Sequence, residues 1–468
     1  MKINSPLEAY KFLPGTNCGQ CGETSCMAFA SHLIDRSLQA TDCTPLIEEK
    51  KYKKKYDELV TLLAPEIREV VIGVGDNAIS IGGDDVLHRH KLTFFNKTAL
   101  AYDVWDTMEE NDLVERVNKI QDFKKFYVGD YLTLDMIAVR SVSNDPKKFA
   151  TTVKKVMETT EFPMVLCSFE PAVLRAGLEV AAEKRPLLYA ANKDNWQEVA
   201  ALAQEFNVPV TVFAPNDLDL LKSMAKTFAD NGIEDVVLDP GTFPTGKGLK
   251  TTLNNFLKIR RAGINGDRDI AFPIMAVPFT AWMAHDDEIS ASYWETVVAS
   301  IFTIKYGDIM IMHSIEPYAL MPQLHIRDTM YTDPRKPVTV DPAVYEIGSP
   351  TADSPLLVTA NFALTYYTVE SDLSSNGVDC YLTAIDTDGI GVEAAVAGGQ
   401  LTAAKIKKGL DDAGFDMGKL THKVIVLPGL AARLQGDVED ELGAAVMIGP
   451  TDSGRLPGWM EQNWPPKK

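Results

Sequence analysis

The sequence predicts an α/β protein of three parts: a small cysteine-rich N-terminal domain, a (β/α)8 TIM barrel and a C-terminal doubly wound α/β domain. Four of the six cysteines lie between residues 18 and 43, strand-like and helical patterns alternate from residue 99 to 330, and five prolines lie between residues 331 and 355. At about 100–200 residues per domain, this length suits two to four domains. We expect domains over residues 1–60, 61–330 and 331–468.

Charge and hydropathy exclude several classes of partner. Lys and Arg total 46 against 65 Asp and Glu, a net charge of −19, which repels both nucleic acid phosphates and anionic bilayers. No apolar run approaches the ~18 residues of a membrane span, and the first residues lack the apolar core of a secretion signal. We therefore expect a cytoplasmic protein that binds neither nucleic acid nor a membrane.

The N-terminal cysteines follow the spacing C-x2-C-x4-C-x16-C, formed by Cys18, Cys21, Cys26 and Cys43. In a reducing compartment this clustering indicates metal ligation. Zinc sites usually pair cysteines as two C-x2-C knuckles, whereas the second gap here is four residues. Glycines beside the first pair let backbone N–H groups approach sulfides. The pattern favours a [4Fe–4S] cluster, with zinc or no metal as the alternatives.

The residues around this cluster predict two local elements. Residues 27–38 have an apolar helical face, and a helix there would return the chain to Cys43. The charged stretch 48–58 is typical of a solvated helix face or a linker. The remaining two cysteines, Cys167 and Cys380, lie in apolar strand-like runs, where we expect buried structural thiols.

The central part alternates apolar strand patterns with amphipathic helical patterns. The expected strands are residues 99–104, 131–139, 163–169, 186–191, 208–214, 235–238, 273–277 and 308–313. The expected helices include residues 146–159, 171–183, 196–206, 218–231, 248–262, 293–306 and 317–330. Strand–helix units repeated over about 230 residues are typical of a closed barrel, and a doubly wound open sheet is the alternative.

Several polar residues follow the expected barrel strands, where a barrel binds its ligands. They are Asp106, Ser168, Glu170, Asn192, Asn216, Asp239 and His313. Their spacing forms no recognisable acid–base pair or metal triad. We therefore expect mostly helix caps and loop contacts, and we predict no catalytic residue.

The proline-rich stretch 331–355 predicts an extended connector. Beyond it we expect strands at residues 356–359, 381–385, 423–427 and 444–448 and helices at 362–369, 392–413 and 430–442. Three strand ends contain glycine, around Gly389, Gly429 and Gly449. In open α/β sheets such ends bind ligands, although ordinary turns explain them equally well. Neither a dinucleotide fingerprint nor a P-loop is present.

Three stretches resemble one known family. They are residues 13–22 (LPGTNCGQCG), residues 358–370 (VTANFALTYYTVE) and the strand end Asp386-Thr387-Asp388-Gly389. The chain is similar over essentially its full length to the large (gamma) subunit of the corrinoid/iron–sulfur protein of the acetyl-CoA decarbonylase/synthase complex. The resemblance implies a [4Fe–4S] domain, a central barrel and a C-terminal corrinoid-binding domain.

The resemblance also implies an activity. In this family cobalt(I) accepts a methyl group from a methyltetrahydropterin, tetrahydrosarcinapterin in methanogens, and passes it as methylcobalt(III) to the nickel cluster of acetyl-CoA synthase. The [4Fe–4S] cluster returns inactive cobalt(II) to cobalt(I). The chain would thus be a corrinoid-dependent methyltransferase subunit. Its implied partners are the small (delta) corrinoid protein subunit in a heterodimer, the acetyl-CoA synthase and CO dehydrogenase subunits, and the methyltetrahydropterin.

The resemblance implies corrinoid contacts at the strand ends of the C-terminal domain. The expected residues are Asn361, Thr365, Thr387, Asp388, Gly389, Ile390, Gly391, Val392, Gly429, Leu430, Ala431, Gly449 and Pro450. Asn361 could equally be the N-cap of a helix beginning at Phe362. The only histidine after His325 is His422. It precedes a predicted strand and therefore lies at the end of the sheet opposite the expected corrinoid site. We therefore predict a base-off corrinoid without a protein histidine on cobalt.

Two alternatives stay open at this point. The chain could be an iron–sulfur electron-transfer subunit without a corrinoid. It could also be a free-standing methyltransferase whose barrel binds the methyl donor, in which case Asn192 or Asp239 would be essential. On our interpretation the barrel is a scaffold and docking surface, and these two residues matter little.

Overall fold

The computed structural model describes residue 3, residues 5–332 and residues 337–465. The chain divides into two compact units, one made of Met1–Asp122 with Leu134–Tyr331 and the other of Phe123–Thr133 with Thr332–Lys468. Residues 333–336 of the predicted connector, and residues 1, 2 and 4 at the start, lie outside the described residues. No helix in the described ranges is long and apolar enough to cross a membrane.

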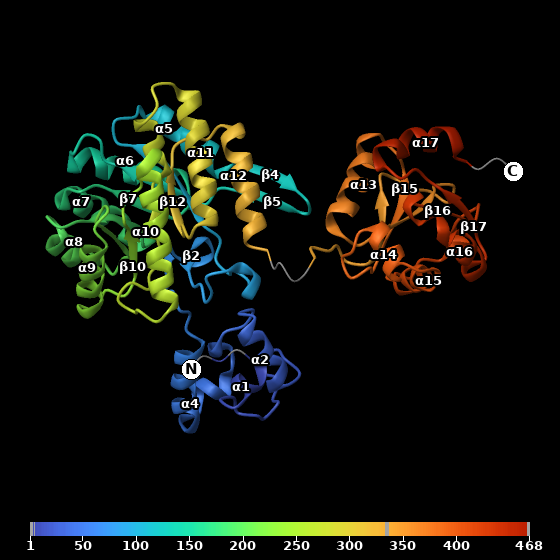
Figure 1. Cartoon of the computed structure of the whole chain (residues 1–468), viewed down its shortest axis with the longest axis horizontal. Helices are drawn as coiled ribbons and strands as arrows, with labels where there is room; N and C mark the ends of the chain where they lie inside the picture. Colours follow the sequence, from blue (N-terminus) through green and yellow to red (C-terminus); the bar gives the residue numbers. More distant parts are fainter. Residues whose placement is uncertain (1–2, 4, 333–336, 466–468) are drawn as a thin grey trace. The chain divides into compact units, whose positions relative to one another are not determined.

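The N-terminal segment is helical (Figure 1). Its elements are α1 (Pro6–Tyr10), α2 (Cys26–Ile34), η1 (Ala40–Asp42), α3 (Thr44–Glu48), η2 (Lys50–Tyr52) and α4 (Lys53–Leu63). Phe29, Leu33 and Leu59 are buried in its core. The helix predicted over 27–38 ends early, at Ile34. The charged stretch 48–58 spans the end of α3, η2 and the start of α4, so a solvated helix face is confirmed only from Lys53 onward, where Leu59 is the one buried residue of α4.

Eight parallel strands form the barrel of the first unit. They are β3 (Ala99–Trp105), β6 (Met136–Arg140), β7 (Met164–Cys167), β8 (Leu187–Ala191), β9 (Val210–Phe213), β10 (Val236–Asp239), β11 (Met275–Ala276) and β12 (Ile309–Met312). Neighbours in the sheet follow chain order, and β12 pairs with β3. A parallel bridge joins Leu238 of β10 to Ile274, the residue before β11. The closed barrel is thus confirmed and the open sheet is wrong.

The barrel core consists of the inward residues of these strands. Ala101, Val165 and Ile311 belong to one buried apolar cluster, which also contains Val70 and Ile81 from the antiparallel hairpin of β1 (Glu69–Ile72) and β2 (Ile79–Gly82). A short 3-10 turn, η3 (Gly75–Asn77), lies between the two strands of this hairpin, and another, η4 (Arg89–Lys91), follows β2. Both expected structural thiols, Cys167 and Cys380, are buried.

Helices surround the barrel strands (Figure 1). They are α5 (Glu110–Gln121), α6 (Pro146–Thr159), α7 (Pro171–Ala181), η5 (Ala182–Lys184), α8 (Trp196–Phe206), α9 (Leu218–Asp230), α10 (Gly246–Ile264), η6 (Pro278–Met283), α11 (Glu288–Ile304) and α12 (Pro317–Met330). One strand prediction was wrong in part. Residues 131–139 contain two strands, because Asp130–Thr133 (β5) pairs with Lys124–Tyr127 (β4) in a separate hairpin before β6 begins.

The second unit contains a five-stranded sheet of order β13-β15-β14-β16-β17. Its strands are β13 (Ala343–Ile347), β14 (Leu356–Ala360), β15 (Cys380–Ile385), β16 (Val424–Leu427) and β17 (Ala445–Ile448). The last four are mutually parallel, and β13 is an antiparallel edge strand. The predicted doubly wound sheet is confirmed, with β13 as an unpredicted addition inside the proline-rich stretch.

The helices of this unit are α13 (Ala363–Ser375), α14 (Val392–Gly398), α15 (Ala403–Asp412), η7 (Met417–Lys419), η8 (Gly429–Leu434), α16 (Gln435–Leu442), η9 (Ser453–Arg455) and α17 (Leu456–Asn463). The single helix predicted over 392–413 is wrong. Gly399 has a φ of 78°, a left-handed conformation that ends α14 and favours glycine. The β4–β5 hairpin belongs to this unit, and its Phe126 ring contacts Tyr367 edge-to-face at 5.6 Å.

Candidate cofactor sites

All four N-terminal cysteines line one small pocket. Cys18 is exposed and Cys21 half-buried, whereas Cys26 and Cys43 are buried. Phe29 is among the other lining residues. The short helices place these thiols together because α2 begins at Cys26 and α3 is preceded by Cys43. Residues far apart in sequence thus converge on a single sulfur-lined site.

The loop that carries the first two cysteines depends on two glycines. Gly19 and Gly22 have φ values of 74° and 85°, a region that residues with a Cβ rarely adopt. The Asn17 side-chain oxygen accepts a hydrogen bond from the Cys26 backbone N–H at 2.8 Å. The Ser25 hydroxyl accepts another from Ala28 at 3.1 Å and caps α2. These bonds fix the loop against the helix that carries the third cysteine.

The electrostatic surroundings of the thiols differ. Hydrogen bonds from the Gln20 backbone and from Thr16 lower the pKa of Cys18. Burial raises the pKa of Cys43. Within the described ranges, no three His, Cys, Asp or Glu side chains are grouped as ligands of one metal ion. A shared pocket of four cysteine thiols, with two glycines in the loop that carries the first of them, has the donor chemistry that an iron–sulfur cluster requires.

The C-terminal sheet has a cavity of about 290 Å³ at the carboxyl ends of its central strands. The chain passes from β14 to β15 on one side and then crosses to β16 on the other, so the direction of the strand order changes at β14. Ligands of open α/β sheets bind outside the strand ends at such a position. Thr359 of β14 and Leu427 of β16 both line this cavity.

The cavity is neutral and mostly apolar. None of its described lining residues is charged, and the polar ones carry hydroxyl groups: Thr359, Thr365, Thr368, Thr451 and Ser453. The Thr365 hydroxyl has no hydrogen-bond partner among the residues that the structure describes, so it can bond to a ligand. Apolar walls with a few hydroxyl groups are typical of a cofactor site.

Five of the thirteen predicted corrinoid contacts line this cavity. They are Thr365, Val392, Leu430, Gly449 and Pro450. The other eight do not line it: Asn361, Thr387, Asp388, Gly389, Ile390, Gly391, Gly429 and Ala431. The lining residues that were not predicted include Thr359, Leu364, Thr368, Thr451 and Ser453. Only the helical spacing of 364, 365 and 368, which places them on one face of α13, could have indicated part of this wall.

Asn361 organises the loop after β15 from a buried position. Its side-chain oxygen accepts hydrogen bonds from the backbone N–H groups of Thr387 at 3.0 Å and Gly389 at 3.2 Å. The residue is 4% exposed. The N-cap alternative is wrong, because Phe362 is the N-cap of α13 and no side chain caps it. Asn361 therefore shapes the strand end.

Two positions at these strand ends require glycine because neighbouring atoms leave no room for a Cβ. A Cβ on Gly389 would lie 2.5 Å from Pro337, which covers this residue. A Cβ on Gly429 would lie 2.8 Å from the Thr451 nitrogen and 2.9 Å from the Gly449 oxygen. The Gly429 N–H also donates to Pro450 at 3.0 Å. Gly429 thus lets the ends of β16 and β17 meet at the cavity.

His422 lies at the amino end of β16, as predicted. Its Nε2 is 3.0 Å from the Ser354 carbonyl oxygen, and its Nδ1 accepts a hydrogen bond from Val424 at 3.0 Å. The ring also contacts Trp464 edge-to-face at 4.6 Å. Both ring nitrogens are therefore used within the protein, at the sheet edge opposite the strand ends that line the cavity.

The polar residues after the barrel strands mostly support their own loops. Asp106 accepts hydrogen bonds from Val142 and Ser143. Asn192 accepts two from the turn before α8. Asp239 accepts one from the Tyr189 hydroxyl at 2.9 Å. The side-chain oxygens of Asn192 and Asp239 are thus engaged within the barrel. His313 differs, because it joins an inward network of charged residues that sequence reasoning missed.

Comparison with known proteins places the chain in a family. The family model for the CO dehydrogenase/acetyl-CoA synthase delta subunit matches residues 69–460, and one described as "Putative Fe-S cluster" matches residues 13–45. Among solved structures, dihydropteroate synthase from Thermus thermophilus is similar, with a TM-score of 0.39 and 18% identity. That similarity covers 56% of this chain and 100% of the synthase.

Curated relatives match over the whole length. The chain is 70% identical to acetyl-CoA decarbonylase/synthase complex subunit gamma 1 of Methanosarcina mazei and 52% identical to subunit gamma of Archaeoglobus fulgidus, each match covering 100% of both chains. It is 40% identical to subunit gamma of Methanothermobacter thermautotrophicus, over 97% of this chain and 98% of the relative. The chain therefore belongs to the gamma subunits of the acetyl-CoA decarbonylase/synthase complex, the family that its sequence motifs resemble.

Proposed function

We propose that this gamma subunit is a corrinoid-dependent methyltransferase subunit, which carries a methyl group between a methyltetrahydropterin, tetrahydrosarcinapterin in methanogens, and acetyl-CoA synthase. The observation that carries the proposal is the neutral, hydroxyl-lined cavity at the switch point of the C-terminal sheet. When bound there, a corrinoid would supply the cobalt that accepts and releases the methyl group. In this proposal residues 331–468 hold the corrinoid and residues 1–60 hold the cluster. Residues 61–330 form the barrel, except for the hairpin of residues 123–133, which belongs to the C-terminal unit.

In this proposal the cavity residues have distinct roles. Val392, Leu430 and Pro450 would supply apolar walls for a bound corrinoid, and the Thr365 hydroxyl would donate a hydrogen bond to its polar periphery. Asn361, through its bonds to Thr387 and Gly389, holds the loop that follows β15. Asp388, Ile390, Gly391, Gly429 and Ala431 remain predicted contacts at the rim.

The four N-terminal cysteines hold a [4Fe–4S] cluster in this proposal. Their shared pocket supports it, as do the glycines that let N–H groups approach inorganic sulfide. A bound cluster would supply the single electron that restores the active cobalt(I) state. The protein contributes the four thiolates and the hydrogen bonds that hold the ligand loop against α2.

We propose that the corrinoid is base-off, without a protein histidine on its cobalt. The position and hydrogen bonds of His422 support this, because both ring nitrogens bond at the amino edge of the sheet. A strong axial donor adds electron density to cobalt and opposes its reduction, so its absence makes cobalt(I) easier to reach. Ligands tune the reduction potentials of haems and iron–sulfur clusters in the same way. His422 then has a structural role, in which it holds the start of β16.

A complex subunit has partner subunits. We propose that they include a delta subunit, which forms a heterodimer with this chain, together with acetyl-CoA synthase and CO dehydrogenase subunits, in the cytoplasm.

The test of the methyl-carrier function uses the reduced heterodimer with labelled methyltetrahydrosarcinapterin. We expect about one labelled methyl group per chain, and none without the reductant. A chain that takes up no label under reduction, in a preparation that contains cobalt, would contradict the proposal.

A further inference from the structure

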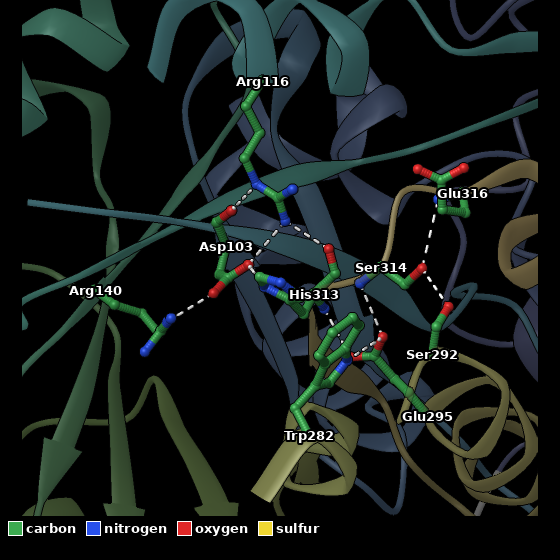
Figure 2. Close-up of polar contacts among 9 residues, drawn as sticks. All are labelled: Asp103, Arg116, Arg140, Trp282, Ser292, Glu295, His313, Ser314 and Glu316. Atoms are coloured by element: carbon green, nitrogen blue, oxygen red, sulfur yellow. Dashed lines mark hydrogen bonds and ion pairs between the residues drawn. The ribbon is translucent and has the colours of Figure 1, made fainter. Parts of the chain in front are cut away.

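A charged network lies at the carboxyl ends of barrel strands β3, β6 and β12 (Figure 2). Asp103, Arg140 and His313 lie on or just after these strands and point into the barrel. Asp103 lies two residues after the core residue Ala101, and His313 lies two residues after the core residue Ile311, so each shares the inward face of its strand. Ligands of TIM barrels bind at this end. The proposed methyl-carrier function uses none of these residues.

The centre of the network is a buried carboxylate with several donors. Asp103, which is 0% exposed, accepts hydrogen bonds from Arg140 Nε at 2.7 Å and Arg116 Nη2 at 3.0 Å, and His313 Nδ1 lies 2.7 Å from it. Burial alone raises the pKa of a carboxyl group. The His313 hydrogen bond and the charges of the two arginines outweigh burial and lower the pKa of Asp103, so it is ionised.

The two arginines are used differently. Arg116 also bonds to the backbone oxygens of Asp103, at 2.7 Å, and His313, at 2.5 Å. Arg140 uses only Nε, and no acceptor among the described residues bonds to its two Nη groups. The Arg140 side chain is 27% exposed. Asp103 thus holds the guanidinium in a fixed position, while its outer edge stays open to solvent.

Other carboxylates near this end do not occupy that edge. Glu295 accepts hydrogen bonds from the backbone N–H groups of His313 and Ser314 and from the Trp282 indole, as Figure 2 shows. Asp239 bonds to Tyr189 and Gly241. Asp103 carries one negative charge and pairs with both Arg116 and Arg140. The two guanidinium groups therefore carry one positive charge more than this carboxylate balances.

Aromatic rings surround the open guanidinium. The Arg140 carbon Cζ lies 4.4 Å from the Phe279 ring centre and 5.7 Å from the Trp105 ring centre. The Trp282 ring lies 4.4 Å from the His313 ring. Apolar walls reduce the local dielectric constant and strengthen a charge-assisted hydrogen bond. Two parallel N–H groups of an arginine match the two oxygens of a carboxylate or phosphate.

We propose that the open end of the barrel binds a small oxyanion, a carboxylate or phosphate group, through the two Nη groups of Arg140, with Asp103 and Arg116 as positioning residues. The proposal concerns the barrel and is independent of the corrinoid site. It identifies a ligand site that carries no catalytic residue and recognises its ligand by negative charge and by two oxygens that match the two Nη groups.

The test is calorimetric titration of the anaerobic full-length chain with inorganic phosphate and, separately, with benzoate. We expect at least one of them to bind saturably, and Arg140→Gln to weaken that binding about tenfold or more. Tighter binding of benzoate would identify a carboxylate site with aromatic walls, and tighter binding of phosphate a phosphate site. Arg175→Gln is the matched control, because Arg175 pairs with Glu205 on the exposed surface.

A further variant separates binding from folding. Arg140→Lys keeps a positive charge near Asp103 but loses the forked geometry, so we expect folded protein with several-fold weaker binding. Circular dichroism establishes that each variant is folded, and Arg140→Lys alone decides the test if Arg140→Gln does not fold. Absence of saturable binding of both anions, or equal affinity in wild type and in the folded Arg140 variants, would overturn the proposal.

Discussion

The Asn361 side-chain oxygen lies 3.0 Å from the Thr387 backbone nitrogen and 3.1 Å from the Thr387 hydroxyl. Asn361 follows β14 and Thr387 follows β15, so one buried carboxamide joins the carboxyl ends of two neighbouring strands. Thr387 is fully buried. The loop after β15, which we propose to face the corrinoid, is therefore held by buried hydrogen bonds to Asn361 and not by apolar packing alone.

Replacement of Asn361 tests this contact. Asn361→Ala leaves the N–H groups of Thr387 and Gly389 buried without an acceptor, so we expect the free energy of unfolding to fall by about 1–3 kcal/mol. We also expect lower cobalt retention after gel filtration. Asn376→Ala is the control, because the exposed Asn376 bonds only to its own helix, and it should cost less than about 0.5 kcal/mol. Equal effects of the two variants would contradict the assigned role.

A methyl group at Gly429 tests the approach of β16 and β17. The Cβ of Gly429→Ala would lie 2.8 Å from a backbone nitrogen, and such overpacking costs about 1–3 kcal/mol. At Gly436 in α16 a Cβ meets no atom within 4 Å, so Gly436→Ala should be neutral or stabilise by up to about 1 kcal/mol. Denaturant unfolding measures both, and a Gly429→Ala chain as stable as wild type would be inconsistent with the close approach.

Replacement of His422 tests the base-off proposal. His422→Phe keeps the ring contact with Trp464 but removes the bonds to Ser354 and Val424. We expect a loss of about 1 kcal/mol in stability and an unchanged cobalt(II) EPR spectrum of the reconstituted heterodimer. A shifted spectrum, or loss of nitrogen splitting present in wild type, would show that His422 binds cobalt.

Asp239 should make the stability of the barrel depend on pH. Burial raises the pKa of Asp239 to about 7 in the folded chain, whereas an unfolded Asp ionises near ~3.9. The unfolded state therefore loses its proton first as pH rises. Relative to Asp239→Asn, wild-type stability should be greatest below about pH 4, fall by up to about 4 kcal/mol as pH rises to about 7, and then level off.

Denaturant unfolding at several pH values measures this difference, and a difference that is constant with pH would contradict the buried ionisation.

The Asp239→Asn variant also tests the methyl-donor alternative. On our interpretation Asp239→Asn keeps methyl transfer, because Asp239 bonds to Tyr189 and Gly241 within the barrel. Abolished transfer by a folded variant would favour a barrel that binds the methyl donor.

Most of the fold could be predicted because apolar periodicity encodes it. Helices α6, α8 and α12 begin and end at the predicted residues, and the capping aspartate and proline at the start of α6 mark its first turn. The strand β13 could not be predicted, since most of this edge strand is only half-buried and prolines flank it. Likewise, residues 131–139 contain no turn signal that would separate β5 from β6.

The candidate sites were predictable to different degrees. Cysteine spacing alone identified the four residues that line the N-terminal pocket. The strand-end glycines located the correct edge of the C-terminal sheet and only part of the cavity wall. Thr368 and Ser453 reach the cavity from α13 and η9, and local sequence does not encode how those elements pack. The inward network of Asp103 and Arg140 was missed because both residues lie within apolar strands.

The most direct test of the central claim is metal analysis with EPR on the anaerobically co-expressed chain and delta partner, reconstituted with a cobamide, before and after strong reduction. We predict about four iron and one cobalt per chain, with a five-coordinate cobalt(II) signal that lacks nitrogen splitting. Cys26→Ser should lose iron, whereas Cys167→Ala, at a buried strand position, should keep it. Four iron without cobalt would contradict the methyl-carrier account and leave an iron–sulfur electron-transfer subunit.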